Sequence, residues 1–156
     1  MSVTIWRLVK ARHAGQAFDG EGARRYGGRW NSPGTRMVYG SESRALAALE
    51  LLVHVPVNLL SQPFRFFSIR IPSRHVRSFT PATLPSGWNA PLISPETQAL
   101  GDEWIRSGQS PVLRVPSAII PGESNYLINP ANPDFEKLAV AQPEPFSFDS
   151  RIARQT

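Results

Sequence analysis

The sequence predicts an α+β fold in one domain spanning 1–156, with short, mostly antiparallel strands and two principal helices. The length of 156 residues suits one domain with a sizeable hydrophobic core. Two segments, 41–54 and 94–108, carry both a start and a stop signal for a helix. The other apolar segments are short and are interrupted by many of the 15 prolines and 11 glycines, as is typical of strands joined by turns.

The first forty residues predict two strands with a long loop between them. Residues 4–10 alternate and are rich in apolar side chains, which indicates a first strand. Residues 11–34 have no sustained period, and a loop of this length in a compact domain is usually functional or disordered. The aromatic side chains of this loop argue against disorder. Residues 35–40 form the expected second strand.

A helix is expected to follow directly. Ser41 is a suitable N-cap, Glu42 would lie in the first turn, and the helix should run to about His54 because Pro56 stops it. Its predicted apolar stripe consists of Ala45, Leu46, Leu49, Leu52 and Val53. Glu50 stands at the edge of this stripe, where a carboxylate can form the wall of a cavity or simply extend to water.

The remaining elements are a second helix and several short strands. Residues 64–71 are apolar enough for a buried third strand, and 70–94 indicate an irregular surface connection. Ser94, Pro95 and Glu96 predict a helix start, Leu100, Trp104 and Ile105 should face inward, and Gly108 should end the helix. The expected later strand pieces are 111–116, 119–120, 126–128, 138–140 and 145–148.

Arginine carries most of the positive charge. The chain has a formal net charge of +5, and its 17 basic residues are arginines except for Lys10 and Lys137. The planar guanidinium suits two-point recognition of phosphate or carboxylate. A cationic surface without a special partner, a nucleic acid, a small phosphorylated ligand and an acidic protein partner are all compatible with this charge.

Composition excludes several classes of protein. The chain has no cysteine, which excludes disulfides, thiolate metal sites and a cysteine nucleophile. His13, His54 and His75 lack the spacing of metal ligands, so no metal site is expected. No apolar run approaches the roughly 20 residues of a membrane-spanning helix, and the start lacks a signal-peptide core. We therefore expect a cytoplasmic protein with no membrane segment.

The stretch from Gly20 to Glu50 is the strongest candidate for a functional site. Its first part contains five glycines between Gly20 and Gly34, and the basic and aromatic side chains of Arg24, Arg25, Tyr26, Arg29 and Trp30. Glycine in this quantity indicates left-handed backbone or close approach to another group. A cationic aromatic loop followed by a carboxylate suggests a ligand with phosphates and a cationic or polarisable centre.

Familiar catalytic motifs are missing from the sequence. There is no GxSxG elbow, no Walker loop, no HExxH and no paired-carboxylate motif, and the GxG at Gly20 precedes no βαβ unit. The polar residues that remain as candidates are Arg29, Tyr39, Glu50 and Ser117.

Two runs of sequence resemble the RES-domain family, the toxins of bacterial toxin–antitoxin pairs. These runs are GARRYGGRWNSPGTRMVYGSESRALAALE and VPSAIIPGESNYLINPANPDF, and the similarity extends from Trp6 to about Phe148. The resemblance implies a fold similar to ADP-ribosyltransferase toxins and an activity on NAD+, which is a substrate rather than a cofactor. It implies breakage of the nicotinamide–ribose bond by hydrolysis, phosphorolysis or transfer of ADP-ribose to a protein target.

The resemblance also assigns residues and a partner. The family's arginine, tyrosine, glutamate and serine fall on Arg29, Tyr39, Glu50 and Ser117. Glu50 would stabilise the sugar cation and Arg29 would grip the diphosphate. Tyr39 would offer a flat face, and Ser117 would donate to a ligand oxygen. The weaker candidates for NAD+ binding are Arg12, Tyr26 and the Arg24/Arg25 pair. An antitoxin with a helix-turn-helix module is the implied partner, so DNA contact would belong to that partner.

One departure from the family pattern stands in the late motif. Asn132 occupies the place where family members often have a histidine, and a structural role in the turn is expected for it. Two alternatives to the enzyme remain at this stage. The first is a nucleic-acid-binding module in which Tyr26 and Trp30 stack on bases, and the second is a catalytically inactive interaction domain.

Overall fold

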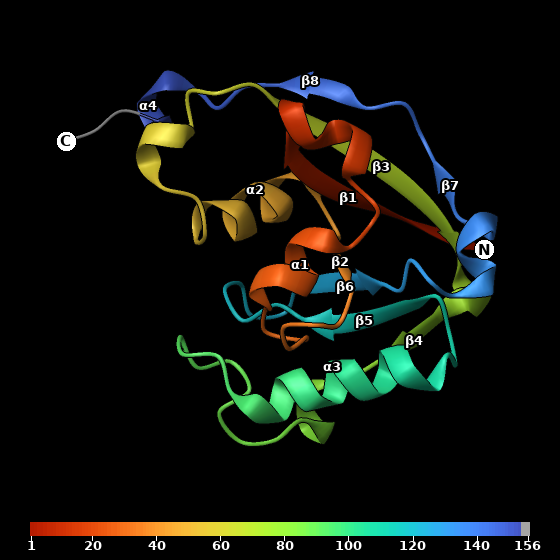
Figure 1. Ribbon diagram of the computed structural model, residues 1–156. Coiled ribbons are helices and arrows are strands. Elements are labelled where there is room, and N and C mark those ends of the chain that lie inside the picture. The colour runs from red at the N-terminus through yellow and green to blue at the C-terminus, as the bar shows by residue number, and fades with distance from the viewer. Residues whose placement is uncertain (154–156) are drawn as a thin grey trace.

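The computed structural model describes residues 1–153 and shows one curled, eight-stranded sheet with helices packed against it (Figure 1). The strand order is β4-β5-β6-β2-β1-β3-β7, and β8 pairs with β3. All pairs are antiparallel except the parallel pair of β4 with β5. The strands are β1 (Ser2–Lys10), β2 (Val38–Ser41), β3 (Phe64–Pro72), β4 (Val76–Ser78), β5 (Val112–Pro116), β6 (Ser124–Ile128), β7 (Ala139–Val140) and β8 (Glu144–Phe146).

The helical elements confirm the α+β class with two principal helices. These are α2 (Arg44–Leu52) and α3 (Pro95–Ser107), and the shorter ones are α1 (Glu21–Tyr26) and α4 (Ser150–Ala153). The 3-10 turns are η1 (Ala11–Gln16), η2 (Val57–Leu59), η3 (Ser73–His75), η4 (Pro81–Thr83) and η5 (Pro133–Lys137). Within residues 1–153, no helix has both the length and the apolar character that crossing a bilayer requires.

The sheet consists of two halves that meet at a narrow junction. β1 pairs with β3 along the whole length of both strands, and β2 pairs with β6 along all of β2. Between β1 and β2, in contrast, the single residue pair is Trp6 with Ser41. The half made of β1 and β3 therefore runs obliquely to the half that contains β5 and β6, as Figure 1 shows.

Three clusters of buried side chains fill the fold. The first draws on both halves of the sheet, with Ile5, Val38, Ile69 and Ile128 among its members, so the curled sheet closes around it. The second packs α2 against the opposite face of β1 and β3, and the third packs α3 against the opposite face of β5 and β6. The two principal helices thus cover separate parts of the sheet and leave the ends of β2 and β6 between them.

The first principal helix begins later than expected, and the face that it buries differs from the predicted one. The N-cap is Ser43, whose hydroxyl accepts from the Leu46 N–H, whereas Ser41 is the last residue of β2. The predicted stripe is right at Leu46, which is buried, and wrong at Leu49 and Val53, which are 39% and 61% exposed, while Ala47 outside that stripe is buried. The reason is that α2 docks on Leu8, Phe64 and Phe66, which select the face containing Ala47.

The predicted long loop at 11–34 is interrupted by η1 and α1. α1 ends at Gly27, which has a left-handed φ of 72°. Glu21 in its first turn forms ion pairs with Arg24, Arg25 and Arg36, which hold the pKa of that carboxyl down at about 2. These short helices carry no buried residue, so they leave no apolar period for a sequence analysis to detect.

The later elements mostly agree with expectation. The Ser94 cap and the Gly108 stop of α3 are confirmed, and Gly108 has a φ of 63°. The connection 70–94 is largely irregular, although it contains the short strand β4. The strand piece at 119–120 is wrong, because the backbone there turns towards the Ser117 hydroxyl instead of pairing.

Candidate active site

Glu50 lies near the C-terminal end of α2 and is held by two side chains from other elements. Its Oε1 atom accepts from the Ser117 hydroxyl at 2.8 Å and from the Asn125 amide at 2.7 Å. In the described part of the chain no donor reaches its Oε2 atom. The structure therefore orients this carboxylate through one oxygen and leaves the other oxygen available, instead of letting the side chain extend to water.

Ser117 is buried at the start of the turn between β5 and β6. Its hydroxyl donates to Glu50 and accepts from the backbone N–H groups of Ile119 and Ile120, both at 3.1 Å. One donor and two acceptor positions are all that a hydroxyl offers. In this conformation the hydroxyl proton bonds the carboxylate, and donation from Ser117 to a ligand oxygen stays a prediction.

Asn125 was missed by the sequence analysis. It lies on β6 opposite Ser41 of β2, whose hydroxyl donates to the Asn125 Oδ1 at 2.7 Å. That bond fixes the amide orientation, so that the Nδ2 group points at Glu50. The pairing of β2 with β6 brings Asn125 and Ser41 together, and no local pattern in the sequence reveals it.

Tyr39 stands two residues before Ser41, so both side chains leave the same face of β2. Its hydroxyl donates to Asn31 at 2.7 Å and accepts from the Trp30 N–H at 3.1 Å. Burial raises the pKa of Tyr39 above its ordinary value, which keeps the hydroxyl protonated. A Cβ at Gly28 would lie 2.7 Å from this hydroxyl, so glycine is required there for close approach.

Asn31 is fully buried and ties the loop around Arg29 to its neighbours. Its amide donates to the carbonyls of Ala23 and Thr35 at 2.8 and 3.0 Å, while its oxygen accepts from Tyr39. Hydrogen bonds thus join Glu50, Asn125 and Ser41 in one series, and Tyr39 and Asn31 in another. The two series start from the same face of β2, at Ser41 and at Tyr39, and the second one leads to the loop that carries Arg29.

Arg29 is half-buried in the loop that joins α1 to β2. One of its terminal nitrogens donates to the Trp88 carbonyl at 2.8 Å, and within residues 1–153 it forms no ion pair with a carboxylate. Its other N–H groups stay available for a ligand in that conformation. The expected two-point contact with a diphosphate remains a prediction.

The remaining predicted binding residues take no part in the hydrogen bonds around Glu50 and Tyr39. Arg12 in η1 is exposed, and Tyr26 at the end of α1 is 82% exposed. The Arg24/Arg25 pair is engaged with Glu21 at the surface. The structure therefore brings Glu50 into contact with Ser117 and, separately, joins Tyr39 to the loop of Arg29.

Arg7 is a half-buried cation that the sequence analysis also missed. It lies on the face of β1 that carries Ile5 and Val9, away from Glu50, and donates to the carbonyls of Ala17 at 2.7 Å and Tyr39 at 2.8 Å. Burial lowers its pKa to about 10, so it stays charged at neutral pH. Arg7 therefore contacts the Tyr39 backbone from the side of the sheet that faces away from Glu50.

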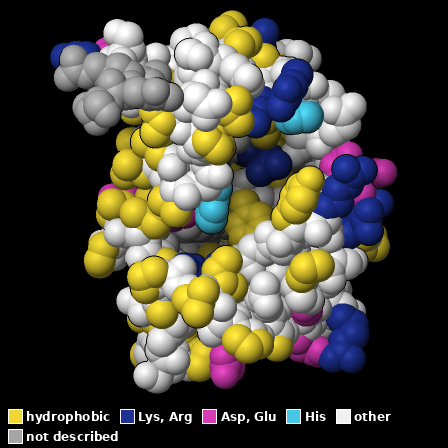
Figure 2. Space-filling model, turned by 60° about the vertical axis from the view of Figure 1, so that its left-hand side comes forward, with side chains coloured by type: hydrophobic (Ala, Val, Ile, Leu, Met, Phe, Trp, Pro, Cys, Tyr) yellow, Lys and Arg dark blue, Asp and Glu magenta, His cyan; other side chains and the backbone are white. Residues whose placement is uncertain are grey.

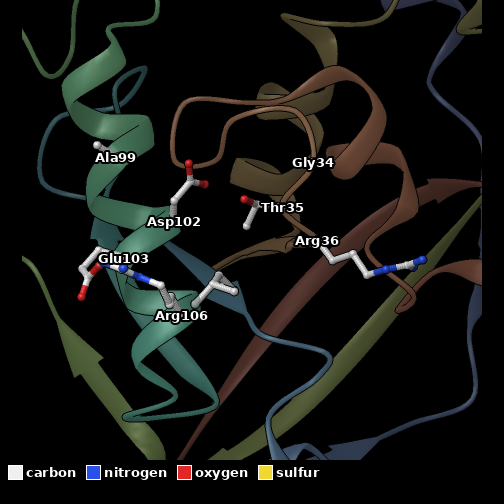
Figure 3. A pocket seen from close by; sticks show the side chains of 8 residues that line it. Gly34, Thr35, Arg36, Ala99, Asp102, Glu103 and Arg106 are labelled. Carbon is white, nitrogen blue, oxygen red and sulfur yellow. The ribbon is translucent and has the colours of Figure 1, made fainter.

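Figure 2 shows the face that is turned forward from the left of Figure 1, where α2 ends. This face is hollowed near its centre, with hydrophobic side chains on the floor and basic side chains above it. A separate open depression of about 610 Å³ lies between α3 and residues 34–36, and none of the predicted site residues lines it (Figure 3).

Asn132 has the structural role expected for it. Its oxygen accepts from the Asp134 N–H at 2.8 Å and caps η5, while its amide donates to the Gly108 carbonyl at 3.1 Å. These bonds tie the turn after β6 to the end of α3.

The fold matches a chain in the crystal structure of the M. tuberculosis MbcT–MbcA toxin–antitoxin complex. The TM-score is 0.76 at 22% sequence identity, over 94% of this chain and 85% of that chain. The α+β fold expected from the sequence is thereby confirmed, and the chain shares this fold with that protein.

The RES domain family model matches residues 4–149, and the chain belongs to this family. It is 40% identical over 151 residues to "Toxin Res" of Photorhabdus laumondii, covering 96% of this chain and 97% of that protein. It is 36% identical over 149 residues to "Toxin Res" of Yersinia enterocolitica, at 95% and 98% coverage. It is 36% identical over 160 residues to the "Prs ADP-ribosylating toxin" of a Sphingobium strain, at 99% coverage of both.

Proposed function

We propose that this protein is the toxin of a toxin–antitoxin pair and that it cleaves the nicotinamide–ribose bond of NAD+. The observation that carries the proposal is the Glu50 carboxylate, which Ser117 and Asn125 hold through one oxygen while the other faces no donor in residues 1–153. Membership of the RES family and relatives named as toxins support it.

The bond that breaks joins the ribose C1′ to the nicotinamide nitrogen. Its electron pair leaves with nicotinamide, which becomes neutral, and positive charge develops on the ribose. A fixed carboxylate stabilises this charge because its orientation needs no rearrangement as the bond breaks. A nucleophile then bonds to C1′ and loses its proton to solvent. Water gives ADP-ribose, phosphate gives a phosphorylated ADP-ribose, and a protein side chain becomes ADP-ribosylated.

The other site residues have supporting roles in this proposal. Ser117 and Asn125 keep Glu50 in place, and the free N–H groups of Arg29 bind the diphosphate. Tyr39 keeps the Arg29 loop adjacent to β2 through its hydroxyl, and its ring offers a flat face to the nicotinamide or ribose in this proposal. Arg12 and Tyr26 contribute at most from the periphery, since both are exposed.

An enzyme that consumes NAD+ harms its own cell, so the proposal includes a cognate antitoxin that carries a helix-turn-helix module. The structural match to a toxin–antitoxin complex supports an antitoxin partner. The net charge of +5 suits an acidic segment of that partner. We place the activity in the cytoplasm, where NAD+ is available.

The alternative of a nucleic-acid-binding module loses its main support in the structure. It needs Trp30 as a stacking surface, but Trp30 is 2% exposed and packs in the cluster under α3. Arg24 and Arg25 are also paired with Glu21. The alternative of an inactive interaction domain is an outcome of the experiment below.

The test is incubation of the purified protein with NAD+, in buffer with and without phosphate, and in a bacterial lysate with labelled NAD+. Release of nicotinamide by the wild-type protein, and its loss in Glu50→Gln, is expected. The ribosyl product and any labelled protein identify the acceptor. Intact NAD+ in every condition would overturn the proposal and favour an inactive domain.

A further inference from the structure

The loop that carries Arg29 is held from outside by one face of α3. Gln98 donates through its amide to the Gly28 carbonyl at 3.1 Å. Asp102, one turn further along the helix, accepts from the Ser32 N–H at 3.0 Å and from the Ser32 hydroxyl in a short hydrogen bond. Gln98 and Asp102 are four residues apart and therefore lie on the same side of the helix.

Gly101 completes this face and allows the loop to touch the helix. A Cβ atom built on Gly101 would lie 1.6 Å from the Trp30 carbonyl oxygen, which no real contact permits. The backbone of the loop therefore rests directly on α3 at Trp30. The residues before and after Arg29 in the chain, Gly28 and Trp30, are both fixed by α3 in this way.

The loop needs such support because its own sequence is permissive. Gly27 and Gly34 adopt positive φ values of 72° and 106°, and Gly28 lies between Gly27 and Arg29. Backbone with this glycine content loses more conformational entropy on ordering than other sequences do. A carboxylate that accepts two hydrogen bonds from one residue restrains such a loop more strongly than neutral acceptors do. Figure 3 shows Asp102 pointing from α3 towards the loop.

We propose that Asp102 is a positioning residue for Arg29, and that the face of α3 formed by Gln98, Gly101 and Asp102 sets the place of the guanidinium. This inference rests on the proposed function, since Arg29 matters only if it binds the diphosphate of NAD+. Asp102 itself does not contact the substrate. It acts through Ser32, three residues after Arg29, and through the backbone contacts on the other side of that arginine.

The test compares Asp102→Ala with Glu103→Ala, a matched control on the next residue of the same helix. Glu103 is exposed and pairs with Arg106 at the surface. In Asp102→Ala, KM for NAD+ is expected to rise by about tenfold or more while kcat changes by less than about threefold, because a misplaced diphosphate contact weakens ground state and transition state alike. Glu103→Ala should keep both constants.

Two further variants separate positioning from loss of structure. Asp102→Asn retains an acceptor for the Ser32 N–H and should restore most of the affinity. Asp102→Ala combined with Arg29→Ala should raise KM no further than Arg29→Ala alone, since residues that act through one another are not additive. Where Asp102→Ala does not fold, Ser32→Ala takes its place in both comparisons, with a smaller rise in KM expected.

The outcomes distinguish this inference from the proposed function. A wild-type protein that neither binds nor cleaves NAD+ overturns the proposed function. A wild-type protein that cleaves NAD+, with a KM that Asp102→Ala leaves unchanged, overturns the positioning role alone. A fall in kcat at unchanged KM, with a lower melting temperature, would also overturn it, because that pattern reports a smaller folded fraction.

Discussion

The two sides of the site are built in different ways. Glu50 stands on a regular helix, and side chains from the turn after β5 and from β6 hold its carboxylate. Arg29 stands on an irregular, glycine-rich loop, and the contacts around it involve mainly backbone groups: the carbonyls of Gly28 and Trp88, and the N–H groups of Trp30 and Ser32.

This difference predicts different consequences of mutation. The carboxylate is fixed at its reacting atoms, so changes there should act on the chemical step. The guanidinium is fixed only through its backbone and one carbonyl, so changes there should act on binding. Kinetic constants for variants on each side test this division.

The largest effect is expected for Glu50→Gln. The substitution retains an oxygen for Ser117 and Asn125 but removes the negative charge that faces the ribosyl cation. Loss of one fixed electrostatic group typically lowers kcat by about 100-fold or more. Nicotinamide release measures the rate, and circular dichroism checks that the fold is intact. Full activity of the variant would refute the role of Glu50.

The next effect is expected for Arg29→Lys. An ammonium cannot form the planar two-point contact with a diphosphate, so KM should rise by about tenfold while kcat changes less. Steady-state kinetics at several NAD+ concentrations separate the two constants. An unchanged KM would show that binding of the diphosphate does not depend on the Arg29 guanidinium.

A comparable effect, on kcat rather than KM, is expected for Asn125→Ala. The variant removes one of the two donors to Glu50 and leaves Ser117 in place. The carboxylate then loses a charge-assisted bond worth about 1.5 kcal/mol, which corresponds to a fall in kcat of roughly tenfold. KM should stay near its wild-type value. A raised KM with normal kcat would contradict a role of Asn125 in the chemical step.

The smallest effect is expected for Arg7→Met, on the face of β1 that points away from Glu50. The variant leaves the carbonyls of Ala17 and Tyr39 without their donor, which destabilises the fold. It also removes a cation whose burial is unfavourable, as its lowered pKa of about 10 indicates. These changes partly cancel, so we expect a net loss of about 1 kcal/mol in the free energy of unfolding. Urea denaturation measures this loss, and an increase in stability would contradict the supporting role of Arg7.

The parts of the fold with strong local signals were predictable from the sequence. The cap and stop of α3 are local features at Ser94 and Gly108, and β1 and β3 have enough apolar residues to be recognised. Glu50 was singled out as a lone carboxylate on an apolar helix, and its pairing with Ser117 is consistent with the family resemblance.

The parts that escaped prediction depend on contacts distant in sequence. Asn125 reaches Glu50 only because β6 pairs with β2 in the register that places it opposite Ser41. The orientation of α2 follows from the aromatic side chains of β3, not from its own stripe. Asp102 contacts Ser32 across 70 positions of the chain, which no spacing rule could have indicated.

The single residue pair between β1 and β2 leaves little main-chain bonding where the two half-sheets meet. A continuous ladder of main-chain bonds at this junction would have to break before the two half-sheets could swing apart. With Trp6 and Ser41 as the single pair, side chains hold the two halves together: the Arg7 guanidinium bonds the Tyr39 carbonyl, and a shared core packs Ile5 and Ile69 against Val38 and Ile128. Main-chain amides beside this pair should therefore exchange with deuterium faster than those between β1 and β3, where a continuous ladder protects them.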